Sequence, residues 1–113
     1  MPYNSHDLIV TIVKKGWADK VVKASKQAGA EGATVIYGRG TGIHEQKKLL
    51  GLSIEPEKEM VLTIILKEET EKVLKAIEKG CSLDKPATGI SFVIELKKVV
   101  GIVHLLEQLG VDE

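Results

Sequence analysis

The chain has 113 residues, of which 43% are hydrophobic and 28% charged, as is usual for one globular domain. Its 16 basic and 16 acidic residues cancel, whereas nucleic-acid binding needs a basic excess, so we expect no nucleic-acid partner. One cysteine, Cys81, excludes an intramolecular disulfide. The first residues lack a signal-peptide pattern, and no apolar run approaches the roughly 18 residues of a membrane span. We therefore expect a single cytoplasmic domain over residues 1–113, without membrane insertion.

The first third of the chain reads as strand, helix, strand. Residues 8–13 are β-branched and almost continuously apolar, which is typical of a buried strand. Residues 17–28 place Trp17, Val21, Ala24 and Ala28 at helical spacing, and Gly29 is suited to ending that helix. Residues 33–37 predict a second strand.

A long, mobile loop is predicted over residues 38–59, because this stretch is rich in glycine and charge. Residues 60–66 then predict a third strand, and residues 68–79 a second helix followed by Gly80. Residues 89–96 alternate between apolar and more polar side chains and predict a fourth strand. The remaining residues, 97–113, form a C-terminal tail in which helical spacing predicts a helix ending at Gly110.

An internal repeat indicates how these elements are arranged. Residues 9–13 resemble residues 61–65, and residues 19–24 resemble residues 71–76, with the same shift of 52 positions in both cases. Two copies of a strand-helix-strand unit predict an α+β fold, the ferredoxin-like split βαβ sandwich with βαββαβ order. Both faces of its strands carry apolar residues, so we expect neighbouring subunits to cover the face opposite the helices.

The long loop contains two features that could bind other molecules. It begins with Gly38, Arg39, Gly40, Thr41 and Gly42, where alternating glycines allow backbone amides to turn toward an anion. Further along, residues 44–50 could form one or two helical turns. Leu49, Leu50 and Leu52 would then offer apolar side chains on a mobile arm, which suggests a surface for docking a protein partner.

Several segments, taken in order, resemble the PII nitrogen-regulatory proteins. They are Gly32-Ala33-Thr34-Val35, then Arg39-Gly40-Thr41-Gly42, the long loop, and Thr88-Gly89 leading into Phe92-Val93. The resemblance runs from about residue 8 to about residue 102. It implies a non-enzymatic signalling protein: a homotrimer that binds an effector such as ATP, ADP or AMP in clefts between subunits. The loop at 38–59 would control a transporter or an enzyme of nitrogen metabolism.

The resemblance also implies which residues contact the effector. The adenine would lie near Ile12 and Thr34, and the phosphates against residues 38–42 and against Thr88 and Gly89. Most of the family's cationic positions differ here: Ile43 and His44 replace Arg-Gln, and Gly101 and Val103 replace two arginines. Each charge-assisted contact contributes about 1.5–3 kcal/mol, so the nucleotide should bind more weakly or be a different one. Replacement cations are available at Arg39, Lys47, Lys48, Lys58 and Lys85.

Three alternative functions are less well supported by the sequence. A metal-responsive or ligand-independent trimeric scaffold could use His44 and Glu45, although no ligand pair has a recognised metal spacing, and we predict no metal site. An enzyme would need a nucleophile and base, and no such set is present, since Cys81 is expected to fill an apolar gap. An RNA-binding sheet is disfavoured because Phe92 and Tyr37 are its only aromatic residues.

Overall fold

The computed structural model describes residues 3–41, 47–49, 52–54 and 56–101. Its elements are β1 (Tyr3–Lys14), α1 (Ala18–Gln27), β2 (Thr34–Arg39), β3 (Lys47–Leu49), β4 (Leu52–Ile54), β5 (Glu57–Leu66), α2 (Lys67–Gly80) and β6 (Gly89–Lys98). Two strand-helix-strand units, β1-α1-β2 and β5-α2-β6, are separated by the short strands β3 and β4.

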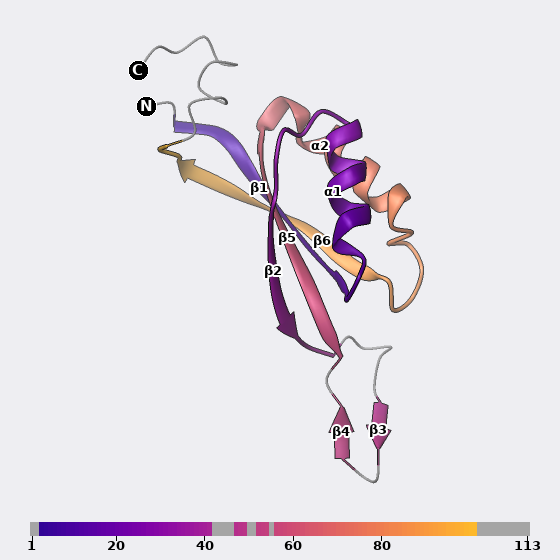
Figure 1. The fold of residues 1–113 in the computed structure, drawn as a ribbon. Helices are drawn as coiled ribbons and strands as arrows, with labels where there is room; N and C mark the ends of the chain where they lie inside the picture. The colour runs from indigo at the N-terminus through magenta and orange to yellow at the C-terminus, as the bar shows by residue number, and fades with distance from the viewer. Residues whose placement is uncertain (1–2, 42–46, 50–51, 55, 102–113) are drawn as a thin grey trace.

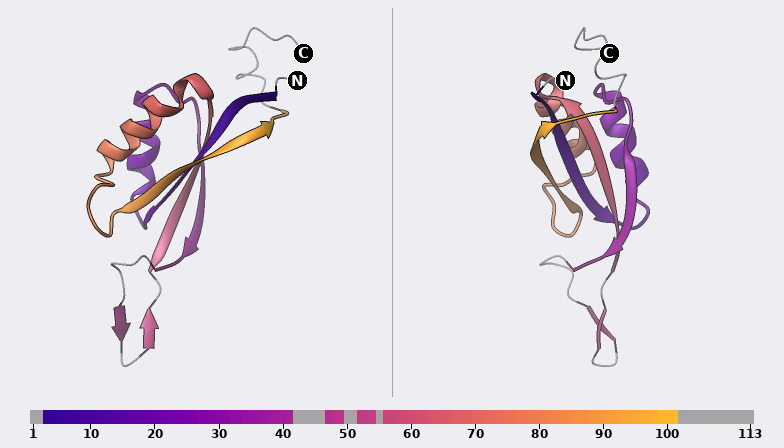
Figure 2. Two further views of the ribbon diagram at one scale, coloured as in Figure 1. Left: turned by 180° about the vertical axis from the view of Figure 1, so that it is seen from behind. Right: turned by 90° about the vertical axis from the view of Figure 1, so that its left-hand side faces the viewer.

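The four long strands form one antiparallel sheet in the order β2-β5-β1-β6. Both helices lie on the same face of this sheet, as the two views of Figure 2 show. This arrangement confirms the predicted βαββαβ, ferredoxin-like fold. Among the described residues, no helix is long and apolar enough to cross a membrane.

The core lies between the sheet and the two helices. Along β5 burial alternates, so that Val61, Thr63 and Ile65 point toward the helices and the residues that alternate with them point the other way. The internal repeat maps onto equivalent buried positions, because Val21 of α1 and Val73 of α2 are both completely buried. Cys81 belongs to the same core cluster, which confirms that it fills an apolar gap, and burial raises the pKa of its thiol.

The helices approach each other closely where α2 ends. A Cβ atom added to Gly80 would lie 2.9 Å from the Cβ of Ala24 on α1. Gly80 is the last residue of α2 rather than a residue beyond it, and its φ is not positive. Its small size therefore serves helix packing, whereas Gly29, with a φ of 115°, provides the left-handed turn after α1.

The face of the sheet opposite the helices is apolar, and in the described part of the chain its β6 and β2 residues are exposed. Leu8, Val10 and Ile12 of β1 lie in register with three apolar residues of β6, namely Ile94, Phe92 and Ile90. The β6 residues are 46%, 40% and 57% exposed, and Ile36 of β2 is 45% exposed on the same face. The apolar set of β6 thus faces away from the helices and forms an open surface.

The segment between β2 and β5 differs from its prediction. Arg39 and Gly38 pair with Glu57 and Lys58, so both ends of the predicted loop, 38–59, are strand. Lys47–Leu49 pairs with Leu52–Ile54 as an antiparallel hairpin, so the predicted helical turns are wrong over residues 47–49. A segment as short as residues 44–50 has no clear hydrophobic period, so its sequence does not distinguish helix from strand. The pairing of β3 with β4 decides the conformation of residues 47–49. We call residues 40–56 the arm; Figure 1 shows the hairpin beyond the start of β5.

Candidate ligand-binding site at the root of the arm

The arm leaves and rejoins the sheet at one corner, where its two ends are hydrogen-bonded together. Arg39, the last residue of β2, lies opposite Glu57, the first residue of β5. One position further out, the amide of Gly40 donates to the carbonyl of Pro56 at 3.1 Å. These backbone bonds hold the root of the arm in a defined geometry that does not depend on its side chains.

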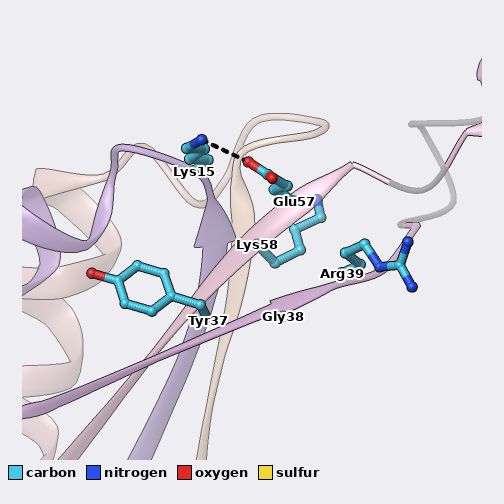
Figure 3. Close-up of a pocket in the computed structure, with 6 residues that line it drawn as sticks. All are labelled: Lys15, Tyr37, Gly38, Arg39, Glu57 and Lys58. Atoms are coloured by element: carbon cyan, nitrogen blue, oxygen red, sulfur yellow. Dashed lines mark ion pairs between the residues drawn. The ribbon is translucent and has the colours of Figure 1, made fainter.

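A pocket of about 400 Å³ opens at this corner (Figure 3). It lies where the ends of β1, β2 and β5 meet, and six residues line it: Lys15, Tyr37, Gly38, Arg39, Glu57 and Lys58. In Figure 3 the ring of Tyr37 and the guanidinium of Arg39 point in opposite directions along β2. The pocket thus combines an aromatic ring with several charged groups.

Lys15 and Glu57, two of the lining residues, form an ion pair. The Lys15 ammonium lies 2.8 Å from a Glu57 carboxylate oxygen, and the amide of Lys15 donates to the Glu57 carbonyl at 3.3 Å. The hydrogen bond and charge of Glu57 raise the pKa of Lys15. Lys15, and more weakly Arg39, lower the pKa of the Glu57 carboxyl group. Both side chains are more than half exposed, so water and salt screen the pair.

A second carboxylate from β5, Glu59, fixes the turn that carries Lys15. Its Oε1 atom accepts hydrogen bonds from the amides of Gly16, at 3.0 Å, and Ala18, at 2.8 Å. Ala18 begins α1, so a buried carboxylate satisfies an amide at the start of that helix. Trp17 lies between these amides, with the ammonium groups of Lys14 and Lys20 each 4.2 Å from its ring centroid.

Only some of the residues predicted to contact a ligand line this pocket. Gly38 and Arg39 do, and so does Lys58, which was expected as a replacement cation. Gly40 and Thr41 follow directly on the arm, and Gly42 lies outside the described residues. Sequence reasoning missed Lys15, Tyr37 and Glu57, because strand register alone brings them to this corner.

Thr88 and Gly89, which the resemblance places against the phosphates, have structural roles in the loop before β6. Thr88 Oγ1 lies 3.0 Å from the Ser82 carbonyl oxygen and 2.9 Å from that of Lys85, so its hydroxyl donates within its own loop. Ala87 has a φ of 63°, which shows that the loop is tightly turned. A Cβ atom on Gly89 would lie 2.6 Å from the Ile12 carbonyl oxygen, so glycine is required for β6 to approach β1. Neither residue lines the pocket.

Ile12 and Thr34, expected near an adenine, lie apart within one chain. Ile12 pairs with Met60 and Ile90, whereas Thr34 pairs with Leu62, and β5 separates the strands that carry them. Ile12 and Thr34 both lie on the open apolar face of the sheet. A ligand that touches both residues would therefore have to lie against this face.

The remaining predicted positions are described only in part. Leu49 and Leu52 pair in the β3–β4 hairpin, while Leu50, His44 and Glu45 lie outside the described residues, as does the predicted C-terminal helix. Within the described ranges, no group of three or more His, Cys, Asp or Glu side chains could hold a metal ion.

Comparison with known proteins identifies the family. Among solved structures, the PII protein of Arabidopsis thaliana, with citrate bound, is similar in fold, with a TM-score of 0.68. It is 21% identical, and the match covers 89% of this chain and 86% of that one. No curated protein sequence matches significantly. The family model for nitrogen regulatory protein P-II matches residues 6–104. Proteins of this family are non-enzymatic signalling regulators, and the chain belongs to the PII family of nitrogen regulatory proteins.

Proposed function

We propose that this PII-family chain is a cytoplasmic homotrimer that senses an adenine nucleotide in clefts between subunits. The observation that carries the proposal is the open apolar face of the sheet, which includes Ile12 and is bordered by Thr34. An exposed apolar surface of this kind is typical of an interface. A second copy packed along it would bring new side chains close to Ile12 and Thr34 and complete a ligand site.

The arm is the segment that we propose contacts the regulated protein. Its root is held by the Arg39–Glu57 strand pairing and by the bond from Gly40 to Pro56, so its starting direction is fixed. The β3–β4 hairpin, which contains Leu49 and Leu52, would contact a transporter or an enzyme of nitrogen metabolism. A nucleotide can shift the arm between conformations only if it binds one of them more tightly than the other.

The test combines a mass measurement with calorimetry. Light scattering during gel filtration should give the mass of three chains. Titration with ATP, ADP and AMP, with and without Mg²⁺, should show saturable binding at about one site per subunit, weakened by Thr34→Val. Lys72→Ala, an exposed change on α2, is the control and should leave binding unchanged. A monomer, or no heat from any of the three nucleotides at millimolar concentration, would contradict the proposal.

Gly89 is unsuitable for this test. Any side chain there meets the Ile12 carbonyl oxygen, so a change at Gly89 would weaken the sheet whether or not a nucleotide binds nearby.

A further inference from the structure

The side chains of Ser5 and His6 meet near the start of β1, although consecutive residues of a strand ordinarily point to opposite faces. The pairing of β1 with β6 explains the exception. Tyr3 pairs with Lys98 and His6 with Leu96, so β1 advances by three residues while β6 advances by two. Such an extra residue forms a β-bulge, which re-aims a side chain. With this bulge, the Ser5 hydroxyl oxygen lies 2.7 Å from His6 Nδ1.

The His6 imidazole is suited to take a proton from Ser5. The residue is 1% exposed, and burial lowers the pKa of His6 below 6.5, although the charges of Glu68 and Asp7 partly oppose the change. The ring is therefore neutral near pH 7, and a neutral imidazole accepts a hydrogen bond at one of its nitrogens. The Asp7 carboxylate is engaged elsewhere, since it accepts the Thr70 hydroxyl of α2 at 2.8 Å.

Ser5 itself is only half-buried, so a small reagent can reach it while the imidazole stays shielded from water. A serine hydroxyl is a weak nucleophile until an adjacent base takes its proton. The separation of 2.7 Å is within hydrogen-bond reach, as proton transfer to a general base requires. An accessible hydroxyl and a buried, neutral base together make an activated nucleophile.

We propose that Ser5 is a site of covalent acylation, to which a small activated acyl ester transfers its acyl group with His6 as general base. The Ser5 oxygen forms a bond to the carbonyl carbon, and its proton passes to His6 Nδ1. The bond from that carbon to the leaving oxygen then breaks, and the leaving oxygen takes the proton from His6. The products are acylated Ser5 and a free alcohol.

The reaction ends at one acyl group per chain, so it is a modification and not enzymatic turnover. The start of β1 lies at the opposite end of the sheet from the β3–β4 hairpin (Figure 1). The site therefore includes no part of the arm and goes beyond the function proposed above.

The experiment treats the whole protein with p-nitrophenyl acetate and locates the acetyl group by peptide mass spectrometry. Ser5 should be acetylated, and Ser5→Ala should remove the label from this peptide. His6→Gln should slow acetylation of Ser5 by about 100-fold or more, because glutamine cannot act as the base. Acetylated lysines, measured in the same spectra, should not respond to this change.

Ser91 provides the matched control. It is half-buried like Ser5, but its hydroxyl lies 2.9 Å from the Thr11 hydroxyl and has no base beside it in the described part of the chain. Ser91 should therefore remain unacetylated, and Ser91→Ala should leave the rate at Ser5 unchanged.

The pH dependence of acetylation in the unaltered protein tests the role of His6 without a substitution that could affect folding. The rate should be level above pH 6.5 and fall as the pH drops through the folded-state pKa, because a protonated ring accepts no proton. Burial sets this pKa together with the charges of Glu68 and Asp7, since Leu66 and Leu96, which pair with His6, do not titrate.

Three results would overturn the proposal. They are the absence of acetyl from Ser5, an unchanged rate in His6→Gln, and a rate that keeps rising in proportion to hydroxide concentration. The reaction requires no nucleotide, so the proposal can fail while the proposed function stands.

Discussion

Gly89 lies where the backbone of β6 comes into contact with β1. Its φ is +151°, and a Cβ atom there would meet the Ile12 carbonyl oxygen at 2.6 Å and Val13 Cγ1 at 2.8 Å. Backbone and core atoms cannot move aside easily, so Gly89→Ala should destabilise the fold by about 1–3 kcal/mol. Urea denaturation measures this loss.

The control for Gly89 is Gly32→Ala. No atom lies within 4 Å of a Cβ added at Gly32, and its φ is not in the left-handed region. This change should leave the free energy of unfolding within about 0.5 kcal/mol of the original, or raise it slightly. Equal losses for the two variants would show that the contact with Ile12 is not the cause.

His6 is a buried group that should make stability depend on pH. Its Nδ1 lies 2.7 Å from the Ser5 hydroxyl, while Nε2 has no hydrogen-bond partner in the described part of the chain. Burial lowers the pKa of His6 below its ordinary 6.5, and the carboxylates of Glu68 and Asp7 partly oppose the change. As the pH falls, the unfolded chain therefore binds a proton at His6 before the folded chain does. The contribution of His6 to the free energy of unfolding is fully present above pH 6.5 and decreases as the pH falls from there toward the folded-state pKa.

His6→Gln tests this dependence, because glutamine is polar but does not titrate. Urea denaturation on either side of pH 6.5 should show a smaller decline in stability for the variant than for the original protein. An unchanged decline would assign the pH dependence to other groups.

At the scale of elements, the start of α1 depends on a side chain from β5. Glu59→Ala would leave the amides of Gly16 and Ala18 without their acceptor, at a cost of about 1–3 kcal/mol. Glu59→Gln keeps an acceptor oxygen and should cost less. Thermal or urea unfolding followed by the fluorescence of Trp17, the single tryptophan, reports on this turn directly.

An exposed glutamate on α2, Glu71, provides the comparison for Glu59. Glu71→Ala should change stability little, because the side chain lies on the surface. If Glu59→Ala and Glu71→Ala behave alike, the two amides are satisfied in another way and Glu59 does not hold α1 in place.

At the scale of the whole molecule, the open face of the sheet should govern assembly. Ile94→Glu places a charge on the apolar face, where a neighbouring copy would bury it, so the proposed trimer should dissociate. Light scattering during gel filtration should then give a smaller mass than for the unaltered protein.

Val93 is the matched control for Ile94. It is the preceding residue of β6, is similarly exposed at 38% against 46%, and points to the other face of the strand. Val93→Glu should therefore leave the mass unchanged. A loss of mass with both variants, or with neither, would mean that the open face is not the interface between subunits.

The sequence by itself determined the long elements, their order and the fold, because hydrophobic period is a local property. The 52-residue repeat led correctly to two equivalent units, with Val21 and Val73 equally buried. The start of β5 was missed because Glu57, Lys58 and Glu59 break the apolar pattern, although their backbone pairs with β2 regardless of side chain. The assignment of Thr88 and Gly89 to a ligand came from the family resemblance and stays a prediction, whereas their contacts within the fold cannot be seen in the local sequence.

Only the tertiary structure decided which face of β6 is open and which side chains meet at the arm root. Lys15 and Glu57 are 42 positions apart, and only the antiparallel register of β1 with β5 brings their charges within 2.8 Å. A shift of one residue in that register would turn every side chain of the strand to the opposite face. Such pairing is set by packing across the whole sheet, which explains why local pattern predicted the strands but not the pocket between them.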